Sequence, residues 1–250
     1  MSRYWVLFIV AFAPIVLFGR EPSGTATKHR SIANASSSYL HLLTGDDGDS
    51  DKLKWDRLYR KTKGYVFGRD PAVSLLEHYT MLPVGRVLDI GMGEGRNAVF
   101  LAKRGFKVEG VDISPEAVRK AKMLAKENGT TIRTVIADLA KYQIEENAYE
   151  VILVYYFLPR KMVNQIVTGL KPCGMLVFES HTVDQLKYDK RQNRDYLLAK
   201  GELETMFKSL QTQVYRETDN GKEAIAFLLA RKPAEAGQKC DDRRKGKNKP

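Results

Sequence analysis

Cysteine is scarce in this sequence of 250 residues. Only Cys173 and Cys240 occur, so a disulfide framework is excluded as the basis of the fold, and zinc-site spacing is absent. Cys240 falls in a polar C-terminal segment, and we therefore expect both thiols to be free. The chain must be held together by a hydrophobic core, for which its length and its hydrophobic share of 43% are sufficient.

Acidic residues are outnumbered, since 41 Lys and Arg face 30 Asp and Glu and give a formal net charge of +11. Such a balance suggests a nucleic-acid or membrane-surface partner. Residues 231–250, however, hold eight Lys and Arg against three acids, which places a large share of the charge in a short tail. No basic stripe interleaved with aromatics occurs elsewhere, and KYDKRQNR at 187–194 is the nearest match. We expect no nucleic-acid partner and a basic disordered tail at 234–250, with a binding arm as the alternative.

Long apolar runs are absent except at the N-terminus. Residues 4–19, YWVLFIVAFAPIVLFG, carry no charge and are followed by a polar, Ser-rich stretch. The run is short for a spanning helix and contains Pro14, so it is typical of a signal-peptide core or a short membrane anchor. We assign 1–26 to a signal peptide or membrane anchor and 27–52 to a flexible linker. The protein is then membrane-associated or exported, with cleavage and the facing side left open.

From about residue 53, strand and helix patterns alternate along the chain. Short apolar runs typical of buried parallel strands lie at 85–91, 107–114, 131–139, 149–157 and 174–181. Helical patterns with start and stop signals lie at 95–105, 114–129, 159–170 and 198–210. Residues 212–219 and 222–232 flank Asn220-Gly221 and predict a hairpin. Residues 53–233 are therefore predicted to form an α/β domain, with a doubly wound, mostly parallel seven-stranded sheet and a C-terminal antiparallel hairpin.

A glycine-rich turn, DIGMGEG, joins the first predicted strand to the next helix. Gly91, Gly93 and Gly95 leave the backbone bare there, but Arg96 stands in place of the third glycine of the dinucleotide fingerprint. Asp89 would also repel a pyrophosphate. A ligand with a cationic amino group and no phosphate fits better. S-adenosylmethionine is such a ligand, and Asp89 can attract its ammonium group.

Two further carboxylates stand at the ends of successive strands. Asp112 ends the second strand, where an acidic side chain accepts hydrogen bonds from ribose hydroxyls. Asp138 ends the third strand and can accept a hydrogen bond from an adenine amino group. The carboxyl ends of parallel strands meet at one edge of the sheet, so these side chains are expected to form one site with the glycine turn.

The same residues carry a family resemblance. The run from Asp89 to Gly95 resembles the first motif of class I S-adenosylmethionine-dependent methyltransferases, and VEGVDIS at 108–114 resembles their second, acidic motif. Segments 55–79, 93–105 and 196–207 are similar to the small-molecule branch that includes tellurite-resistance and thiol or thiopurine methyltransferases.

This resemblance, over about residues 53–233, implies S-adenosyl-L-methionine as the cofactor. The cofactor-binding set that it implies is Asp89, Gly91, Gly93, Gly95, Arg96, Asn97, Asp112, Ile113, Asp138 and Leu139. The sequence departs from the family in KPCG, where Cys173 replaces a glycine of the usual turn. Cys173 must therefore tolerate a backbone conformation that glycine favours.

The implied reaction is an in-line attack on the sulfonium methyl group. The leaving thioether is neutral, so a base is needed only when the acceptor arrives protonated. Candidates for the acceptor side are His181, Tyr155 and Tyr156, and candidates for a lid over the cofactor are Tyr65 and Arg69. Each has a structural alternative: a hydrogen-bonded strand-end histidine, a core tyrosine, or plain packing of the 64–70 segment.

Missing motifs narrow the class of acceptor. The N/D-P-P-Y/F motif of exocyclic amino methylation is replaced by VYYFLPR at 154–160, and Cys173 lies at the wrong end of a strand for a cytosine nucleophile. No metal site is predicted. We expect a small-molecule acceptor: a thiol, a chalcogen oxyanion or a metabolite. The alternatives are a protein or RNA methyltransferase recruited by the basic tail, and a non-catalytic, membrane-anchored cofactor-binding protein. The oligomeric state is left open.

Overall fold

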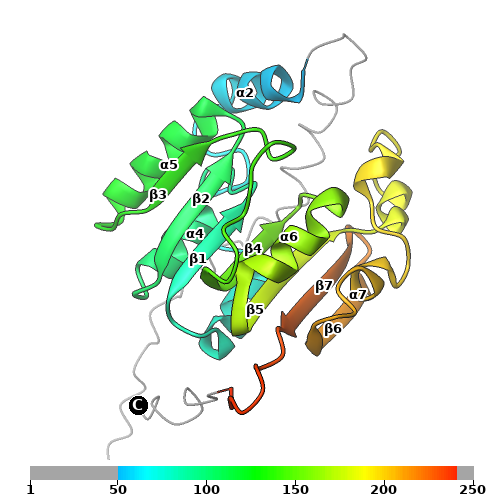
Figure 1. Cartoon of the computed structure of the whole chain (residues 1–250). Helices are drawn as coiled ribbons and strands as arrows, with labels where there is room; N and C mark the ends of the chain where they lie inside the picture. The colour runs from blue at the N-terminus through cyan, green and yellow to red at the C-terminus, as the bar shows by residue number, and fades with distance from the viewer. Residues whose placement is uncertain (1–49, 241–250) are drawn as a thin grey trace, which may run out of the picture. The chain divides into compact units, whose positions relative to one another are not determined.

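The computed structural model describes residues 50–240 (Figure 1). The predicted signal peptide or anchor, nearly all of the predicted linker and the last ten residues of the predicted tail lie outside the described residues. Between residues 50 and 240 we find no helix with the length and apolarity needed to cross a membrane.

A seven-stranded sheet forms the centre of the described region, with the strand order β3-β2-β1-β4-β5-β7-β6 (Figure 1). Its strands are β1 (Arg86–Ile90), β2 (Lys107–Asp112), β3 (Arg133–Ile136), β4 (Tyr149–Tyr155), β5 (Leu170–His181), β6 (Gln211–Asp219) and β7 (Ala224–Arg231). The strands β1 to β5 run parallel, and β7 runs antiparallel between β5 and β6. The predicted mostly parallel sheet with a C-terminal antiparallel hairpin is confirmed.

Helices cover both faces of this sheet. They are α2 (Asp51–Lys61), α3 (Val73–His78), α4 (Arg96–Ala102), α5 (Pro115–Glu127), α6 (Val163–Gly169) and α7 (Glu202–Met206). Short 3-10 helices lie at η1 (Tyr79–Met81), η2 (Arg160–Met162), η3 (Val183–Lys187) and η4 (Arg194–Tyr196).

Alternation of side chains along the strands sorts the core into two layers. Val87 of β1 packs in one buried cluster with Leu101 of α4. Its neighbour Leu88 packs in the other with Ile166 of α6 and Leu203 of α7. Both layers are apolar because the central strands are buried on both faces, as the continuous apolar runs predicted.

Tertiary contacts shorten one predicted element. The helical pattern at 198–210 gives only the five residues of α7, because Leu198 runs extended beside the end of β5. The backbone N–H of Leu198 donates to the His181 carbonyl at 3.0 Å, and its own carbonyl accepts from Val183 at 2.8 Å. Gly201, with φ 71, then begins α7.

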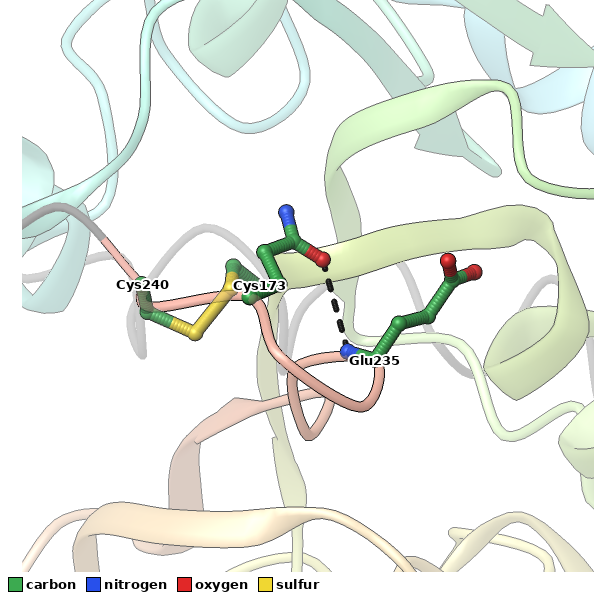
Figure 2. Close-up of a disulfide and its surroundings, with 4 residues drawn as sticks. Cys173, Glu235 and Cys240 are labelled. Atoms are coloured by element: carbon green, nitrogen blue, oxygen red, sulfur yellow. Dashed lines mark hydrogen bonds between the residues drawn. A yellow bond between two sulfur atoms is a disulfide. The ribbon is translucent and has the colours of Figure 1, made fainter.

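Cys173 and Cys240 form a disulfide (Figure 2), so the expectation of two free thiols is wrong. The chain leaves β7 beside the start of β5, where the Lys232 N–H donates to the Gly174 carbonyl at 2.8 Å. This return brings the Cα atoms of the two cysteines to 5.3 Å across 67 residues of sequence. Cys173 has φ 65, the left-handed conformation that the resemblance implied. The bond lies at the edge of the sheet where the parallel strands begin.

Replacing Cys240 by Ser removes a cross-link that closes a 67-residue loop. A loop of this size is worth about 4 kcal/mol in the chain-entropy description, and we expect C240S to lose roughly 2–4 kcal/mol of unfolding free energy. C173G should lose about 1 kcal/mol less, because glycine tolerates the left-handed backbone at this position. Urea denaturation without reductant measures both. The control is the wild-type protein in reductant, whose unfolding free energy should approach that of C240S. Equal unfolding free energies of C240S and the oxidised wild type would contradict the expectation.

Candidate active site

A pocket of about 260 Å³ lies at the carboxyl ends of β1 to β4. It is lined by most of the residues that the sequence singled out, namely Asp89, Gly91, Gly93, Arg96, Asn97, Asp112, Ile113, Asp138, Leu139, Tyr155 and Tyr156. Residues that the sequence analysis missed complete the lining: Asp51, Trp55, Tyr59, Phe67, Gly68, Met92, Glu94, Ala140 and Phe157. The predicted carboxylates and the glycine turn therefore do meet in one site.

The three glycines of the turn have different roles, although all have a left-handed backbone, with φ of 68, 56 and 80 for Gly91, Gly93 and Gly95. A Cβ on Gly91 would lie 3.4 Å from the Phe157 side chain, and one on Gly93 would lie 3.0 Å from the Tyr59 hydroxyl. A Cβ on Gly95 would lie 2.7 Å from Cβ of Ala121. Gly95 thus allows α4 to approach α5 and does not line the pocket, whereas Gly91 and Gly93 form its wall.

Asp112 holds the glycine turn in place. One carboxylate oxygen accepts the Gly93 N–H at 2.8 Å, and the other accepts the Ser114 N–H at 2.9 Å. Burial raises the pKa of Asp112, and these backbone hydrogen bonds counteract the rise. The Ile113 N–H also contributes to these bonds, and the carboxylate keeps acceptor capacity for a hydroxyl group in the pocket. Asp138 lies across the pocket, where its carboxylate accepts the Ala140 N–H at 2.9 Å.

Asp89 is the electrostatic centre of the site. The residue is 2% exposed, and its Oδ2 has no hydrogen-bond partner among the described residues. Burial, and then the neighbouring Asp112, raise its pKa to about 7, against the opposing effects of Arg96 and the Ala98 N–H. A buried oxygen of this kind is costly unless a donor reaches it. An ammonium group in the pocket supplies both the donor and the compensating charge, so the donor set fits the amino-acid end of S-adenosylmethionine.

We call α2 and residues 62–68 the covering segment. A buried ion pair fastens this segment to the glycine turn. The Lys120 ammonium of α5 donates to Glu94 at 3.0 Å, to the Tyr59 and Gly64 carbonyls at 2.7 Å each and to the Thr62 carbonyl at 3.1 Å. Glu94, in turn, accepts the Val66 N–H at 2.7 Å. These bonds fasten the end of α2 and residues 62–66 to the glycine turn, and α2 lies beside α5 (Figure 1).

The sequence contained one signal for this arrangement. Lys120 interrupts the apolar stripe of the predicted 114–129 helix, with Ala117, Ala121 and Leu124 around it, and all four side chains are buried. A lysine in such a stripe requires partners in the interior.

Three candidate acceptor-side or lid residues lie outside the pocket lining. His181 is 9% exposed, its ring centroid lies 5.0 Å from that of Tyr156, and burial lowers its pKa to about 4. Arg69 forms an ion pair with Glu127 and lies over the Tyr65 ring at 5.3 Å. The 64–70 segment reaches the pocket through Phe67 and Gly68 instead. The predicted roles of His181, Tyr65 and Arg69 stay predictions.

Comparison with known proteins agrees with this arrangement. Residues 87–174 match a family described as "Methyltransferase domain". The ubiquinone biosynthesis O-methyltransferase of Burkholderia pseudomallei is 30% identical over 133 residues, which cover 51% of this chain and 54% of that protein. A putative methyltransferase of Geobacillus sp. is 30% identical over 131 residues, which cover 45% and 49%. The chain thus spans about half the length of the curated relatives it matches.

Solved structures share the fold at lower identity. A structure titled "Conversion of a Disulfide Bond into a Thioacetal Group during Echinomycin Biosynthesis" has a TM-score of 0.59 at 18% identity, covering 75% of this chain and 95% of that one. An S-adenosylmethionine-dependent methyltransferase of Methanosarcina mazei has a TM-score of 0.54 at 18% identity, covering 66% and 100%. TehB of Haemophilus influenzae has a TM-score of 0.56 at 20% identity, covering 72% and 66%.

The sheet order and the position of the pocket at the carboxyl edge define a Rossmann-like α/β fold, which solved methyltransferase structures share. Residues 87–174 of the chain are similar to a methyltransferase domain, and the fold is that of a solved S-adenosylmethionine-dependent methyltransferase.

Asp89 predicts a pH dependence of cofactor binding. With a pKa of about 7 in the free protein, Asp89 loses its charge as the pH falls, and its attraction for a ligand ammonium is lost with it. We expect the Kd for adenosylhomocysteine to be about ten-fold higher at pH 6 than at pH 8, with a proton released on binding near pH 6.5. D89N should bind more weakly at pH 8 and show no such slope. Calorimetry in buffers of different ionisation enthalpy measures both quantities, and a flat wild-type profile would contradict this assignment.

D89N, which should weaken ligand binding, is expected to raise the unfolding free energy of the ligand-free protein. The folded pKa of Asp89 lies above its unfolded value of 3.8, so its contribution to stability is present below that value and is lost as the pH rises through about 7. Ligand-free D89N should therefore exceed the wild type in unfolding free energy at pH 8, by at most about 4 kcal/mol, with the difference vanishing toward pH 4. D138N, at a more exposed carboxylate, is the matched control.

The buried bonds of Lys120 predict that the covering segment contributes both to the unfolding free energy and to ligand binding. K120M leaves Glu94 and three carbonyls without their cation, which should cost about 3–5 kcal/mol and weaken adenosylhomocysteine binding, because the cover is no longer fastened. K120M/E94Q should be less destabilised than the sum of the single variants. K122M removes an exposed lysine from the same helix and should change the unfolding free energy by less than about 0.5 kcal/mol. Thermal unfolding and calorimetry test this set, and equal effects of K120M and K122M would contradict it.

Proposed function

We propose that the protein is an S-adenosylmethionine-dependent methyltransferase that transfers the methyl group to a small-molecule nucleophile. The observation that carries the proposal is the buried Asp89 Oδ2, which has no hydrogen-bond partner among the described residues and lies at a pocket that Asp112 and Asp138 also line. A sulfonium nucleoside with an ammonium group satisfies this oxygen, whereas a dinucleotide brings two phosphates against it.

In this proposal, different pocket residues contact different parts of the cofactor. Asp89 holds the ammonium group, Asp112 accepts from the ribose hydroxyls, and Asp138 accepts from the adenine amino group. Gly91 and Gly93 leave room for the ligand along the backbone. The bound cofactor supplies an electrophilic methyl group with a neutral leaving group. The protein orients the nucleophile in line with that methyl group and excludes water from it.

Two observations support a small acceptor. Trp55 and Tyr59 of α2 and Phe67 line a pocket of about 260 Å³, which favours an acceptor small enough to fit beside these aromatic side chains. One relative is by name an O-methyltransferase of ubiquinone biosynthesis, which favours a hydroxyl acceptor on a metabolite. The resemblance of segments 55–79 and 196–207 to the tellurite-resistance and thiol branch favours a thiol or a chalcogen oxyanion.

The basic residues after 231 favour a second candidate, in which a protein or RNA substrate is recruited by the tail. A non-catalytic, membrane-anchored cofactor-binding protein is a further alternative. The membrane association or export that we propose through residues 4–19 is supported by the Cys173–Cys240 bond, since disulfides persist in oxidising compartments.

Methyl transfer from labelled cofactor, screened over thiols, phenols, tellurite, selenite and small acids, tests the proposal. A truncation after Cys240 removes residues 241–250 but keeps the disulfide, and its kcat/KM with the best small acceptor should stay within about two-fold of the full chain. A large loss confined to protein or RNA substrates would favour the recruited enzyme. Calorimetry showing binding of NADH and none of adenosylhomocysteine would overturn the cofactor assignment.

A further inference from the structure

A tyrosine in an unusual backbone conformation lines the pocket directly after β4. Tyr156 has φ 54, in the left-handed region that non-glycine residues rarely occupy. Its backbone N–H donates to the Glu179 carbonyl at 2.8 Å, and its phenol donates to the Glu179 carboxylate at 2.9 Å. Tyr156 is thus bound to Glu179 of β5 through both its backbone and its side chain, and it is one of the residues that line the pocket.

Glu179 is buried behind that ring. It is 4% exposed, and no lysine or arginine in residues 50–240 forms an ion pair with it. The groups around it come from five elements or loops: Ser74 of α3, Tyr155 and Tyr156 from the end of β4, Arg96 of α4, His181 of β5 and Glu223 before β7. Burial raises the pKa of Glu179, against the hydrogen bonds of Ser74 and Tyr156 and the charge of Arg96. A raised pKa makes Glu179 a better proton acceptor than an ordinary surface carboxylate.

Arg96 places a positive charge beside the same phenol. The residue is 8% exposed and lines the pocket, and its guanidinium carbon lies 5.9 Å from the Tyr156 ring centroid. Its guanidinium donates a hydrogen bond to the Phe67 carbonyl at 3.4 Å, and it forms no ion pair with any acid in the described part of the chain. A negative charge that develops on an acceptor in this part of the pocket is therefore stabilised.

We propose that Tyr156 and Glu179 together take the proton from an acceptor that arrives as an un-ionised hydroxyl or thiol, while Arg96 stabilises the developing anion. This inference rests on the proposed function and specifies its acceptor: a weak acid of the phenol or thiol kind. It also assigns the base to this pair and not to His181, whose pKa is lowered by burial to about 4.

The acceptor proton passes to the Tyr156 oxygen as the phenolic proton of Tyr156 passes to Glu179 Oε1. The acceptor lone pair forms the new bond to the methyl carbon, and the electrons of the broken carbon–sulfur bond stay on sulfur as a neutral thioether. Glu179 becomes a neutral acid and later releases its proton to water. Each change neutralises a charge, so no other reactant is required.

The test compares two probe acceptors at neutral pH: phenol, which is un-ionised, and 4-nitrothiophenol, which is ionised. Y156F and E179Q should each lose about 100-fold in kcat/KM with phenol and less than about five-fold with 4-nitrothiophenol. Raising the pH toward the pKa of phenol should narrow the gap. The double variant should be little worse than either single one, because the two groups act as a unit.

The chain offers a matched control. Tyr142 donates to Glu109 at 3.0 Å in a second tyrosine–glutamate pair, which does not line the pocket. Y142F and E109Q should leave both reactions within about two-fold of the wild type. Thermal unfolding and adenosylhomocysteine affinity check that each variant is folded, and Y156F keeps the test valid if E179Q does not fold.

Equal losses on the two acceptors, or no loss, would overturn the proton role of the pair. So would a wild-type enzyme that binds adenosylhomocysteine but methylates 4-nitrothiophenol alone or neither probe, and the cofactor assignment would survive those results. Absence of adenosylhomocysteine binding would instead overturn the proposed function itself.

Discussion

The buried carboxylate of Asp89 sets the chemistry of the site. Its Oδ2 has no partner among the described residues, and desolvation raises its pKa to about 7, so the free protein holds a group balanced between its two protonation states. A cationic ligand favours the ionised state of Asp89, because it supplies both a hydrogen-bond donor and a positive charge. The same sheet in dinucleotide-binding proteins presents a helix N-terminus to phosphates. Here a carboxylate stands beside the glycine turn, and the proposed selectivity for a sulfonium amino acid rests on this difference in charge.

The cover of the pocket depends on a second buried charge. Lys120 and Glu94 both lie in the interior, where an ion pair is tolerated only if its remaining bonds are satisfied. Three carbonyls of the 59–64 region and the Val66 N–H satisfy them, which means that the covering segment and the ion pair require each other. Packing of residues 59–66 and formation of this side of the pocket are therefore coupled.

The sequence was most informative where the physics is local. Continuous apolar runs indicate the buried strands, and the common direction of parallel strands predicts that Asp89, Asp112 and Asp138 lie at one edge of the sheet. It was uninformative where distant segments meet. No local pattern relates Cys173 to Cys240, because only the return of the chain from β7 to the start of β5 brings them together. The helical pattern at 198–210 was overridden by backbone pairing of Leu198 with the end of β5. The sequence of residues 64–70 likewise does not indicate that Phe67 and Gly68 line the pocket, and the predicted roles of Tyr65 and Arg69 stay predictions.

The disulfide bears on where the protein works. A cysteine with φ 65 is at a disadvantage to the glycine that usually occupies such a turn, unless its sulfur is bonded. The bond to Cys240 supplies that compensation only in an oxidising environment, which agrees with the proposed export or anchoring through residues 4–19. Because the disulfide lies where the parallel strands begin and the pocket lies where they end, reduction removes no group from the site. A change of compartment therefore acts first on the stability of the domain, and it reaches the chemistry only through the supply of cofactor.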